Sequence, residues 1–463
     1  MRKKTILILN VFLLLSMLSI PVRAEGQSTG RVQQTQTPVV IVLDPGHGGK
    51  NDGTTENGFL EKSMTMVTAL AAYEELQKYE GIEVYLTHTE DEDMSLKERA
   101  EFAASVNADF LFSIHYNASE NHELFGSEVW ISCAPPYHAY GYQFGWLQMK
   151  QMEEMGLSLR GIKTRQNNDK EDYYGVIREC VALEVPAVII EHCHVDEPRD
   201  TVFLSSDEDL KAFGVADATS IARYFGLKST ILGVDYSTGV DYPAILPEEK
   251  NRLAFRDETA PDICIIEKQA IDTDDLTVTL DVSAADYDSM LLYYDYSLDG
   301  GLTYSTRQLW PDCNIYDGSY RDSFPLTLEI PEGTVNPSIV IRAYNNFDLF
   351  LESNTVKVEQ VFSSARENSA DQAISVLSEA SDISSESLQT VTFTPDSQAT
   401  DTASSKALKL KNFLGICVII VIVLLIIVLT SQFIAMHQKS KRRRRKLADK
   451  RRERYDDKPN RNI

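Results

Sequence analysis

The stretch Val39-Val-Ile-Val-Leu-Asp-Pro-Gly-His-Gly-Gly49 joins an apolar, β-branched run to a Pro/Gly turn that contains one histidine. A continuous Val/Ile/Leu run of this length is typical of a parallel strand that is buried on both faces. Proline and glycine end the run and let the backbone turn sharply. His47 is therefore expected just beyond the carboxyl end of a buried strand, where ligands and catalytic groups gather in open α/β sheets.

Three downstream segments begin or end in a histidine or a glutamate, which are side chains that can bind a metal ion. Glu61 opens an expected helix whose apolar residues Met64, Val67, Leu70 and Ala71 follow helical spacing. Residues 110–115 and 187–191 are buried-strand patterns that end in His115 and Glu191. Two histidines and a carboxylate form an N/O donor set that suits zinc and leaves a fourth position open for water. A further carboxylate beside them would serve as a general base.

These residues belong to motifs that resemble those of a known enzyme family. The motifs are similar to those of zinc-dependent N-acetylmuramoyl-L-alanine amidases, which trim bacterial peptidoglycan, and the resemblance covers roughly residues 38–226. They occur in the family's order: Leu43–Gly49, Asp52-Gly53, Glu61-Lys62, Leu86-Thr87, Ser95–Arg99, Ser113-Ile-His-Tyr-Asn117 and Pro186-Ala-Val-Ile-Ile-Glu191.

The resemblance implies one zinc ion per catalytic domain, bound by His47, Glu61 and His115. It implies that Glu191 takes a proton from the attacking water and returns it to the departing L-alanine amine. The substrate would be the amide bond between N-acetylmuramic acid and L-alanine. Two alternatives stay open at this point. One is a zinc peptidase that cuts the stem peptide, and the other is a membrane-anchored wall-binding protein that no longer cuts.

The chain departs from the family pattern at two places. After Glu191 the family usually continues with a Gly-Phe pair and a Ser-Asn turn, whereas this chain reads His192-Cys-His-Val-Asp196. His192 and His194 are two residues apart, so they share one face of an extended segment, opposite Glu191. They are predicted to line the substrate cleft or to hold an extra metal ion. His88 stands where an arginine commonly follows Leu86-Thr87.

Strand and helix patterns alternate through residues 38–226, which predicts an α/β catalytic domain with a largely parallel sheet flanked by helices. Residues 127–131 alternate in polarity and are expected to form an edge strand. Ser95-Leu-Lys-Glu98 is a capping box that predicts a helix to about Val106. Further helices are expected over 139–155 and from Ser206 or Asp207, with Leu210, Phe213, Ile221 and Phe225 facing inward.

The regions outside this domain differ from it in composition. Residues 1–24 have a basic start, an apolar core and a small-residue cleavage site, as a signal peptide does; an uncleaved anchor helix is the alternative. Residues 227–261 are expected to be a connector. Residues 262–360 contain short alternating runs split by Asp, Gly and Pro, which predict a β-sandwich of immunoglobulin or fibronectin type. This sandwich is interpreted as a spacer or a binding module, and its partner is unknown.

The last hundred residues predict a membrane anchor. Residues 361–411 are rich in Ser, Thr, Ala, Asp and Gln, which is typical of a disordered linker. Residues 413–436 are apolar, uncharged and long enough to span a bilayer once. Residues 437–463 are strongly basic, which predicts a cytoplasmic tail, with the catalytic domain outside a bacterial cell membrane. The tail would be a plain stop-transfer signal or would also bind anionic lipid head groups.

Charge and cysteine content narrow the remaining functions. The chain carries a net charge of −24, while the tail 437–463 carries +9 and residues 1–24 carry +4, which leaves −37 for residues 25–436. Such an acidic region will not be drawn to nucleic acid. Six cysteines without a closely spaced pair indicate no disulfide framework. Spacing alone leaves open whether Cys264 and Cys313 pair.

Overall fold

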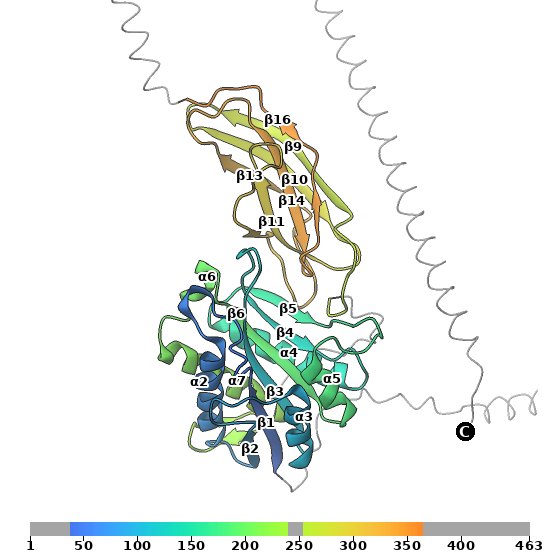
Figure 1. Cartoon of the computed structure of the whole chain (residues 1–463). Helices are drawn as coiled ribbons and strands as arrows, with labels where there is room; N and C mark the ends of the chain where they lie inside the picture. Colours follow the sequence, from blue (N-terminus) through green and yellow to red (C-terminus); the bar gives the residue numbers. More distant parts are fainter. Residues whose placement is uncertain (1–37, 239–252, 364–463) are drawn as a thin grey trace, which may run out of the picture. The chain divides into compact units, whose positions relative to one another are not determined.

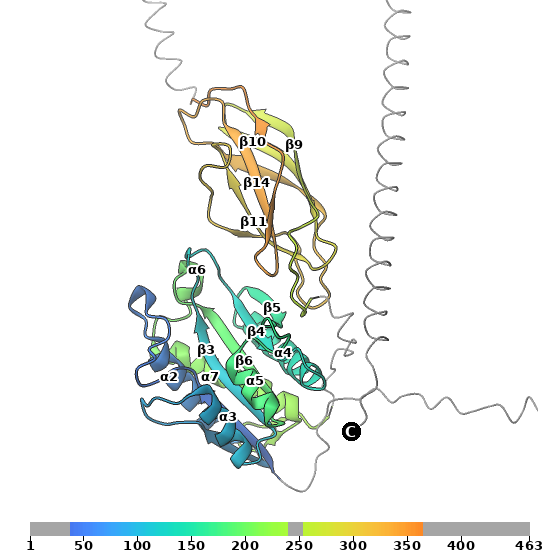
Figure 2. The same ribbon diagram turned by 45° about the vertical axis from the view of Figure 1, so that its right-hand side comes forward.

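The computed structural model describes residues 38–238 and 253–363, shown in Figures 1 and 2. The first segment contains a six-stranded sheet with the order β2-β1-β3-β6-β4-β5. Neighbours from β2 to β6 run parallel, β4 runs antiparallel to β6, and β5 runs parallel to β4. The predicted largely parallel sheet is therefore confirmed. The strands are β1 (Val39–Pro45), β2 (Ile82–Leu86), β3 (Phe110–Asn117), β4 (Ser127–Ile131), β5 (Leu159–Lys163) and β6 (Ala187–His194).

Helices cover both faces of this sheet (Figures 1 and 2). One face packs against α2 (Glu61–Leu76), α4 (Tyr137–Glu154) and α7 (Asp207–Phe225), and together they form the larger core. The other face packs against α3 (Leu96–Ser105) and α5 (Gly175–Ala182) in a smaller core. Two short helices, η1 (Glu56–Gly58) and α6 (Pro198–Thr201), lie in connecting loops.

Strand β1 shows why the opening stretch decides this architecture. Ile41 and Leu43 contribute to the larger core, while Val42 contributes to the smaller one. All three side chains are fully buried, as the continuous apolar run predicts for a strand covered on both faces. The chain then turns at the Pro/Gly segment, which places His47 beyond the carboxyl end of the strand.

Several predicted helices are confirmed, and the buried side of one of them does not follow its apolar residues. Ser95 caps α3 through the expected capping box with Glu98, and α7 begins after the cap Ser206. In α2, however, Leu70 is exposed, because the buried side of the helix is formed largely by small and polar residues. That side packs closely against α7 at Gly214, where a Cβ would overlap the backbone of α2. The buried residues of α2 are Glu61, Met64, Thr65, Thr68, Ala69, Ala72 and Leu76.

The prediction that residues 127–131 form an edge strand is wrong. This segment, β4, lies between β6 and β5, and β5 forms the edge. Strand β5 carries Arg160, Gly161 and Lys163, so no apolar or alternating pattern marks it in the sequence. It is held there in part by ion pairs of Arg160 and Lys163 with Glu128 of β4.

The second described segment is rich in β-structure. It contains a three-stranded sheet, β13-β10-β9, and a second sheet, β12-β11-β14-β15, in which β16 also pairs with β14. Residues of both sheets share one core that includes Trp310 and Phe362. The immunoglobulin or fibronectin likeness stays a prediction. The strands are β9 (Ile263–Asp272), β10 (Thr277–Ala285), β11 (Leu291–Ser297), β12 (Gln308–Leu309), β13 (Ser323–Glu329), β14 (Ser338–Asn345), β15 (Phe350–Glu352) and β16 (Val356–Lys357).

Residues 227–261 contain a short hairpin of β7 (Lys228–Ser229) and β8 (Val234–Asp235). It is held to the turn after α2 by a hydrogen bond from the Ser229 hydroxyl to the Lys78 carbonyl. The predicted signal peptide, linker, membrane span and basic tail lie outside the described residues. Within the described residues, no helix has the length and apolar character needed to cross a membrane. The five cysteines described there, including Cys264 and Cys313, are free thiols.

Candidate metal centre

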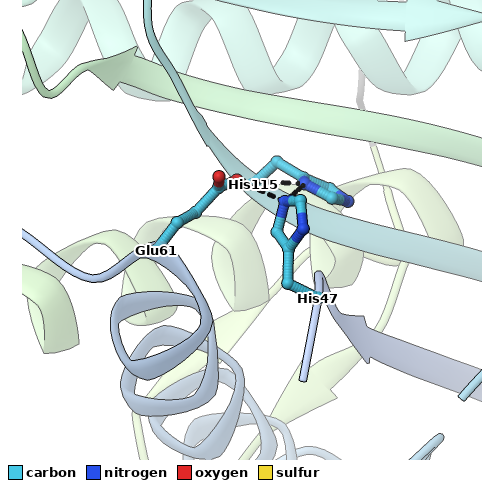
Figure 3. A group of neighbouring side chains, drawn as sticks. All are labelled: His47, Glu61 and His115. Atoms are coloured by element: carbon cyan, nitrogen blue, oxygen red, sulfur yellow. Dashed lines mark hydrogen bonds and ion pairs between the residues drawn. The ribbon is translucent and has the colours of Figure 1, made fainter. Parts of the chain in front are cut away.

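Three side chains from separate elements converge at the carboxyl ends of β1 and β3 (Figure 3). His47 follows β1, Glu61 is the first residue of α2, and His115 lies in β3. The Glu61 Oε1 atom is 3.0 Å from His47 Nε2 and 3.1 Å from His115 Nδ1. The two imidazole nitrogens are 3.2 Å apart. The three residues predicted as metal ligands are therefore brought together.

Glu61 is fixed by backbone donors on both carboxylate oxygens. The Tyr116 amide donates to Oε1, and the Thr54 amide donates to Oε2 at 2.8 Å. The position at the start of α2 also favours a negative charge. Gly53 has φ +70°, and a Cβ there would overlap the Glu61 side chain. Backbone geometry thus holds this buried carboxylate against the two histidines.

His47 lies in a loop whose backbone adopts an unusual conformation. Its φ of 69° is in the left-handed region, which is uncommon for a residue other than glycine. The Arg99 guanidinium of α3 stabilises this conformation by donating to the carbonyls of Pro45 and His47. The His47 Nδ1–H donates to Asn51 Oδ1 at 3.0 Å. This bond leaves Nε2 as the ring nitrogen that faces Glu61 and is available to a metal ion.

His115 is oriented by a similar chain of hydrogen bonds. The Ser113 hydroxyl donates to Asp44 Oδ2 at 2.7 Å, so its oxygen accepts the Nε2–H of His115. Asp44 in turn accepts hydrogen bonds from Thr87 and Arg99. His115 Nδ1 is therefore the ring nitrogen that faces Glu61 and is available to a metal ion. Metal-binding histidines commonly have such partners on the second ring nitrogen.

The donor set fits a zinc ion. Donors about 2.0–2.1 Å from a tetrahedral zinc lie roughly 3.3 Å from one another, close to the 3.0–3.2 Å measured among the three atoms. Burial opposes ionisation of Glu61, but hydrogen bonds and charge from the two histidines outweigh it and lower the Glu61 pKa. Burial likewise opposes protonation of His47, yet Glu61 raises its pKa. The cluster thus combines an ionised carboxylate with two imidazoles.

Glu191 lies beside this cluster. It pairs in register with His115 across β3 and β6, so both side chains are on the same face of the sheet. Its Oε2 atom is buried and has no hydrogen-bond partner among the described residues. Burial first, and then the charges of Glu61 and Glu128, raise the pKa of Glu191 well above its usual value.

Glu128 extends the row of charged groups away from the metal centre. It pairs in register with Glu191 across β4 and β6. Arg160 Nε and Lys163 Nζ donate to its Oε2 at 3.0 and 2.8 Å, and Asn117 Nδ2 donates to Oε1. Burial opposes ionisation of Glu128, but Lys163 and Arg160 outweigh it and lower the Glu128 pKa. Sequence reasoning missed this group, because the strand β5 that supplies its cations was not predicted.

A pocket of about 620 Å³ opens beside His47 and His115. Its walls include Asn51, the start of α3 at Ser95 and Leu96, and Val176 of α5. Leu96 is half exposed, so the pocket offers an apolar surface close to the donor cluster. A substrate group can therefore approach the cluster between the starts of α3 and α5.

The prediction that His192 and His194 line the substrate cleft is wrong, and among the described residues neither belongs to a group of possible metal ligands. Both share the face opposite Glu191, as expected, but that face is covered and both side chains are fully buried. His192 Nε2 contacts Asp217 of α7 at 3.0 Å. His194 Nδ1 lies 3.2 Å from the Gly126 carbonyl. They stabilise the layer on the other side of the sheet.

Comparison with known proteins agrees with this geometry. The profile of the N-acetylmuramoyl-L-alanine amidase (Amidase_3) family matches residues 41–223. The chain is 33% identical over 190 residues to the N-acetylmuramoyl-L-alanine amidase CwlM of Bacillus licheniformis, over 41% of this chain and 70% of the relative. It is 30% identical over 193 residues to the sporulation-specific N-acetylmuramoyl-L-alanine amidase of Bacillus subtilis, over 42% and 70% of the two chains.

Solved structures give weaker similarity. Cwp6 from Clostridium difficile has a TM-score of 0.38 with 31% identity, and the match covers 40% of this chain and 29% of that one. The catalytic domain of CwlV from Bacillus (Paenibacillus) polymyxa has a TM-score of 0.36 with 26% identity, over 41% and 99% of the two chains. On the identity and coverage of its curated relatives, the chain belongs to the N-acetylmuramoyl-L-alanine amidase family, which hydrolyses the amide bond between N-acetylmuramic acid and L-alanine in peptidoglycan.

Proposed function

We propose that this amidase is zinc-dependent, with one zinc ion on His47, Glu61 and His115 and with Glu191 as the general base and acid. The convergence of three donor atoms within 3.2 Å of one another carries this proposal. Hydrogen bonds to Asn51 and Ser113 occupy the other ring nitrogen of each imidazole, so that His47 Nε2 and His115 Nδ1 are the nitrogens left to bind a cation beside Glu61.

The protein groups account for the proton transfers of amide hydrolysis. A zinc ion at this site supplies Lewis-acid activation of the amide carbonyl and of the attacking water. Glu191 accepts a proton from that water as the new C–O bond forms at the lactyl carbonyl. When the C–N bond breaks, Glu191 returns the proton to the L-alanine amine. The buried, otherwise unpartnered carboxylate oxygen of Glu191 is available for both transfers.

The test is elemental analysis of the purified full-length chain together with mass spectrometry of digested peptidoglycan. We expect one zinc per chain, and release of free stem peptides from intact glycan strands. His47→Ala and His115→Ala should each lose the metal, because two protein ligands rarely retain it. Full zinc occupancy in either variant would refute the ligand assignment. Cuts inside the stem peptide would instead support the peptidase alternative.

We also propose that the enzyme is anchored in the bacterial cell membrane through residues 413–436, with the catalytic domain outside and residues 437–463 in the cytoplasm. The sequence supports this proposal through the basic run beside the apolar segment.

Cysteine labelling in intact cells tests this orientation. A reagent that cannot cross membranes should label a cysteine placed at Ser381 and miss one placed at Lys458. Both probes belong in a Cys313→Ser background, because Cys313 is the least buried of the five described thiols. The reverse labelling pattern would overturn the orientation.

A further inference from the structure

A cationic side chain near the proposed active site has no counter-ion among the described residues. Arg165 follows β5, and its guanidinium carbon lies 3.6 Å from the ring centroid of Tyr173. Its Nε atom is buried without a hydrogen-bond partner. By contrast, Arg160 of β5 is paired with Glu128 and Asp348. An arginine held this way is poised to bind an anion brought by a ligand.

The loop that carries Arg165 is held in place at its base. The Tyr173 amide donates to the Arg165 carbonyl at 2.8 Å, and Gln166 and Asp172 form the next bridge. Stacking of the guanidinium on the Tyr173 ring fixes its plane. The Arg165 side chain therefore loses little conformational freedom when it binds a ligand, which favours binding.

Aromatic side chains connect Arg165 with the row of carboxylates. The ring centroids of Tyr173 and Tyr174 are 5.3 Å apart, and those of Tyr174 and Trp130 are 4.9 Å apart. The Trp130 indole N–H donates to Glu128, the register neighbour of Glu191. Tyr174 and Trp130 are both partly exposed. They form an aromatic wall between Glu191 and Arg165.

The proposed role of Glu191 indicates which part of the substrate lies along this aromatic wall. Glu191 gives its proton to the L-alanine amine, so the peptide part of the substrate lies on the Glu191 side of the scissile bond. The wall and Arg165 continue from Glu191 on that same side of the sheet. The charge of Glu128 is already neutralised by Arg160 and Lys163, which leaves the Arg165 cation available.

We propose that Arg165, stacked on Tyr173 and reached along Trp130 and Tyr174, binds a free carboxylate of the stem peptide on the residue that follows L-alanine. This inference rests on the proposed role of Glu191, because that role sets the direction of the peptide. It makes Arg165 a specificity-determining residue. An amide at the same peptide position retains the shape of the carboxylate but lacks its charge.

The test compares two muropeptides that differ only in a glutamate or its amide after L-alanine. The wild-type enzyme should prefer the carboxylate form through a lower KM, and Arg165→Gln should raise the KM for that form about 10- to 100-fold, the range for losing a hydrogen bond to a charged group. The KM for the amide form and kcat for both should change little. Arg165→Lys should restore part of the preference. Arg321→Gln, which removes an exposed arginine in the β-rich segment, is the charge-matched control.

Two outcomes would overturn the proposal. One is equal treatment of both muropeptides by the wild-type enzyme, and the other is an unchanged preference in Arg165→Gln. Equilibrium binding of the two free stem peptides to the full chain separates this proposal from the catalytic one. If Glu191→Gln is fully active yet the carboxylate peptide still binds more tightly through Arg165, the catalytic assignment fails and the subsite stands.

Discussion

At the scale of single residues, Glu191 is a carboxylate whose surroundings differ from those of an ordinary surface acid. It follows the apolar run at the start of β6, which continues to His194, and its Oε2 is buried without a partner among the described residues. Burying a carboxylate oxygen without a hydrogen-bond partner costs free energy, so a structural role alone does not explain a glutamate at this position. We predict that Glu191→Gln keeps the bound zinc and loses roughly 10²- to 10⁴-fold in kcat. Near-normal turnover in a zinc-loaded variant would assign the proton transfer to another group.

Ser113 gives a second prediction at this scale. Its oxygen accepts the Nε2–H of His115 and its hydrogen is donated to Asp44. Ser113→Ala removes the group that fixes the ring orientation of His115, so zinc affinity should fall about 10- to 100-fold. Competition with a chelator measures this affinity. Ser105→Ala, at an exposed site at the end of α3, is the control, and equal affinities in the two variants would contradict the proposed role.

Some site residues leave a pattern in the sequence and others do not. His47, His115 and Glu191 end apolar runs, so their gathering at one edge of the sheet follows from strand order. The hydrogen-bonding roles of Asn51 and Ser113 depend on side-chain directions that no pattern specifies. His192 was assigned to the cleft because alternation separates two faces without showing which one a helix covers. Here α7 covers it, through Asp217.

At the scale of elements, the missed strand β5 shows the same limit. Buried apolar runs such as β1 and β3 were recognised because hydrophobic burial leaves a periodic signal. Strand β5 is held in part by ion pairs of Arg160 and Lys163 with Glu128, which lies more than thirty residues earlier. Partners so distant in the sequence do not produce a local pattern. As a result, β4 was interpreted as the edge of the sheet.

The same ion pairs predict how stability depends on pH. The Glu128 pKa is lowered in the folded protein by Lys163 and Arg160. Ionised Glu128 therefore contributes fully to the free energy of unfolding above the pKa that it has in the unfolded chain, about 4.3. This contribution is lost as the pH falls toward the lower pKa of the folded protein. Glu128→Gln should reduce the free energy of unfolding at pH 7 by about 3–5 kcal/mol, because two buried cations lose their shared partner. It should also weaken the decline of stability below pH 4.3.

Denaturant unfolding at pH 7 and at several values below 4.3 measures both effects. Glu98→Gln is a suitable control, since Glu98 is an exposed carboxylate in a capping box that also has a lowered pKa. Equal stability of Glu128→Gln and the wild-type protein at pH 7 would show that the cations find other partners.

At the scale of the whole molecule, the family match ends at residue 223, yet the described structure continues into the β-rich segment. Both segments belong to one compact unit. Arg160 Nη2 of β5 donates to Asp348 Oδ2 at 2.7 Å, and the Tyr293 hydroxyl donates to the Phe125 carbonyl at 2.7 Å. Because Arg160 also binds Glu128, the β-rich segment is linked to the row of charges beside Glu191.

This link predicts that a substitution in the β-rich segment destabilises strand β5 of the catalytic sheet. Arg160 is almost fully buried and has two carboxylate partners, and Asp348→Ala removes one of them. The free energy of unfolding should fall by about 1–3 kcal/mol, and backbone amides of β5 should exchange hydrogen faster. Asp312→Ala is the matched control, because it breaks an exposed pair with Arg321 that is worth at most about 1 kcal/mol. If the two variants exchange equally at β5, the β-rich segment contributes nothing to holding this strand, and its contact with Arg160 is without mechanical consequence for the active site.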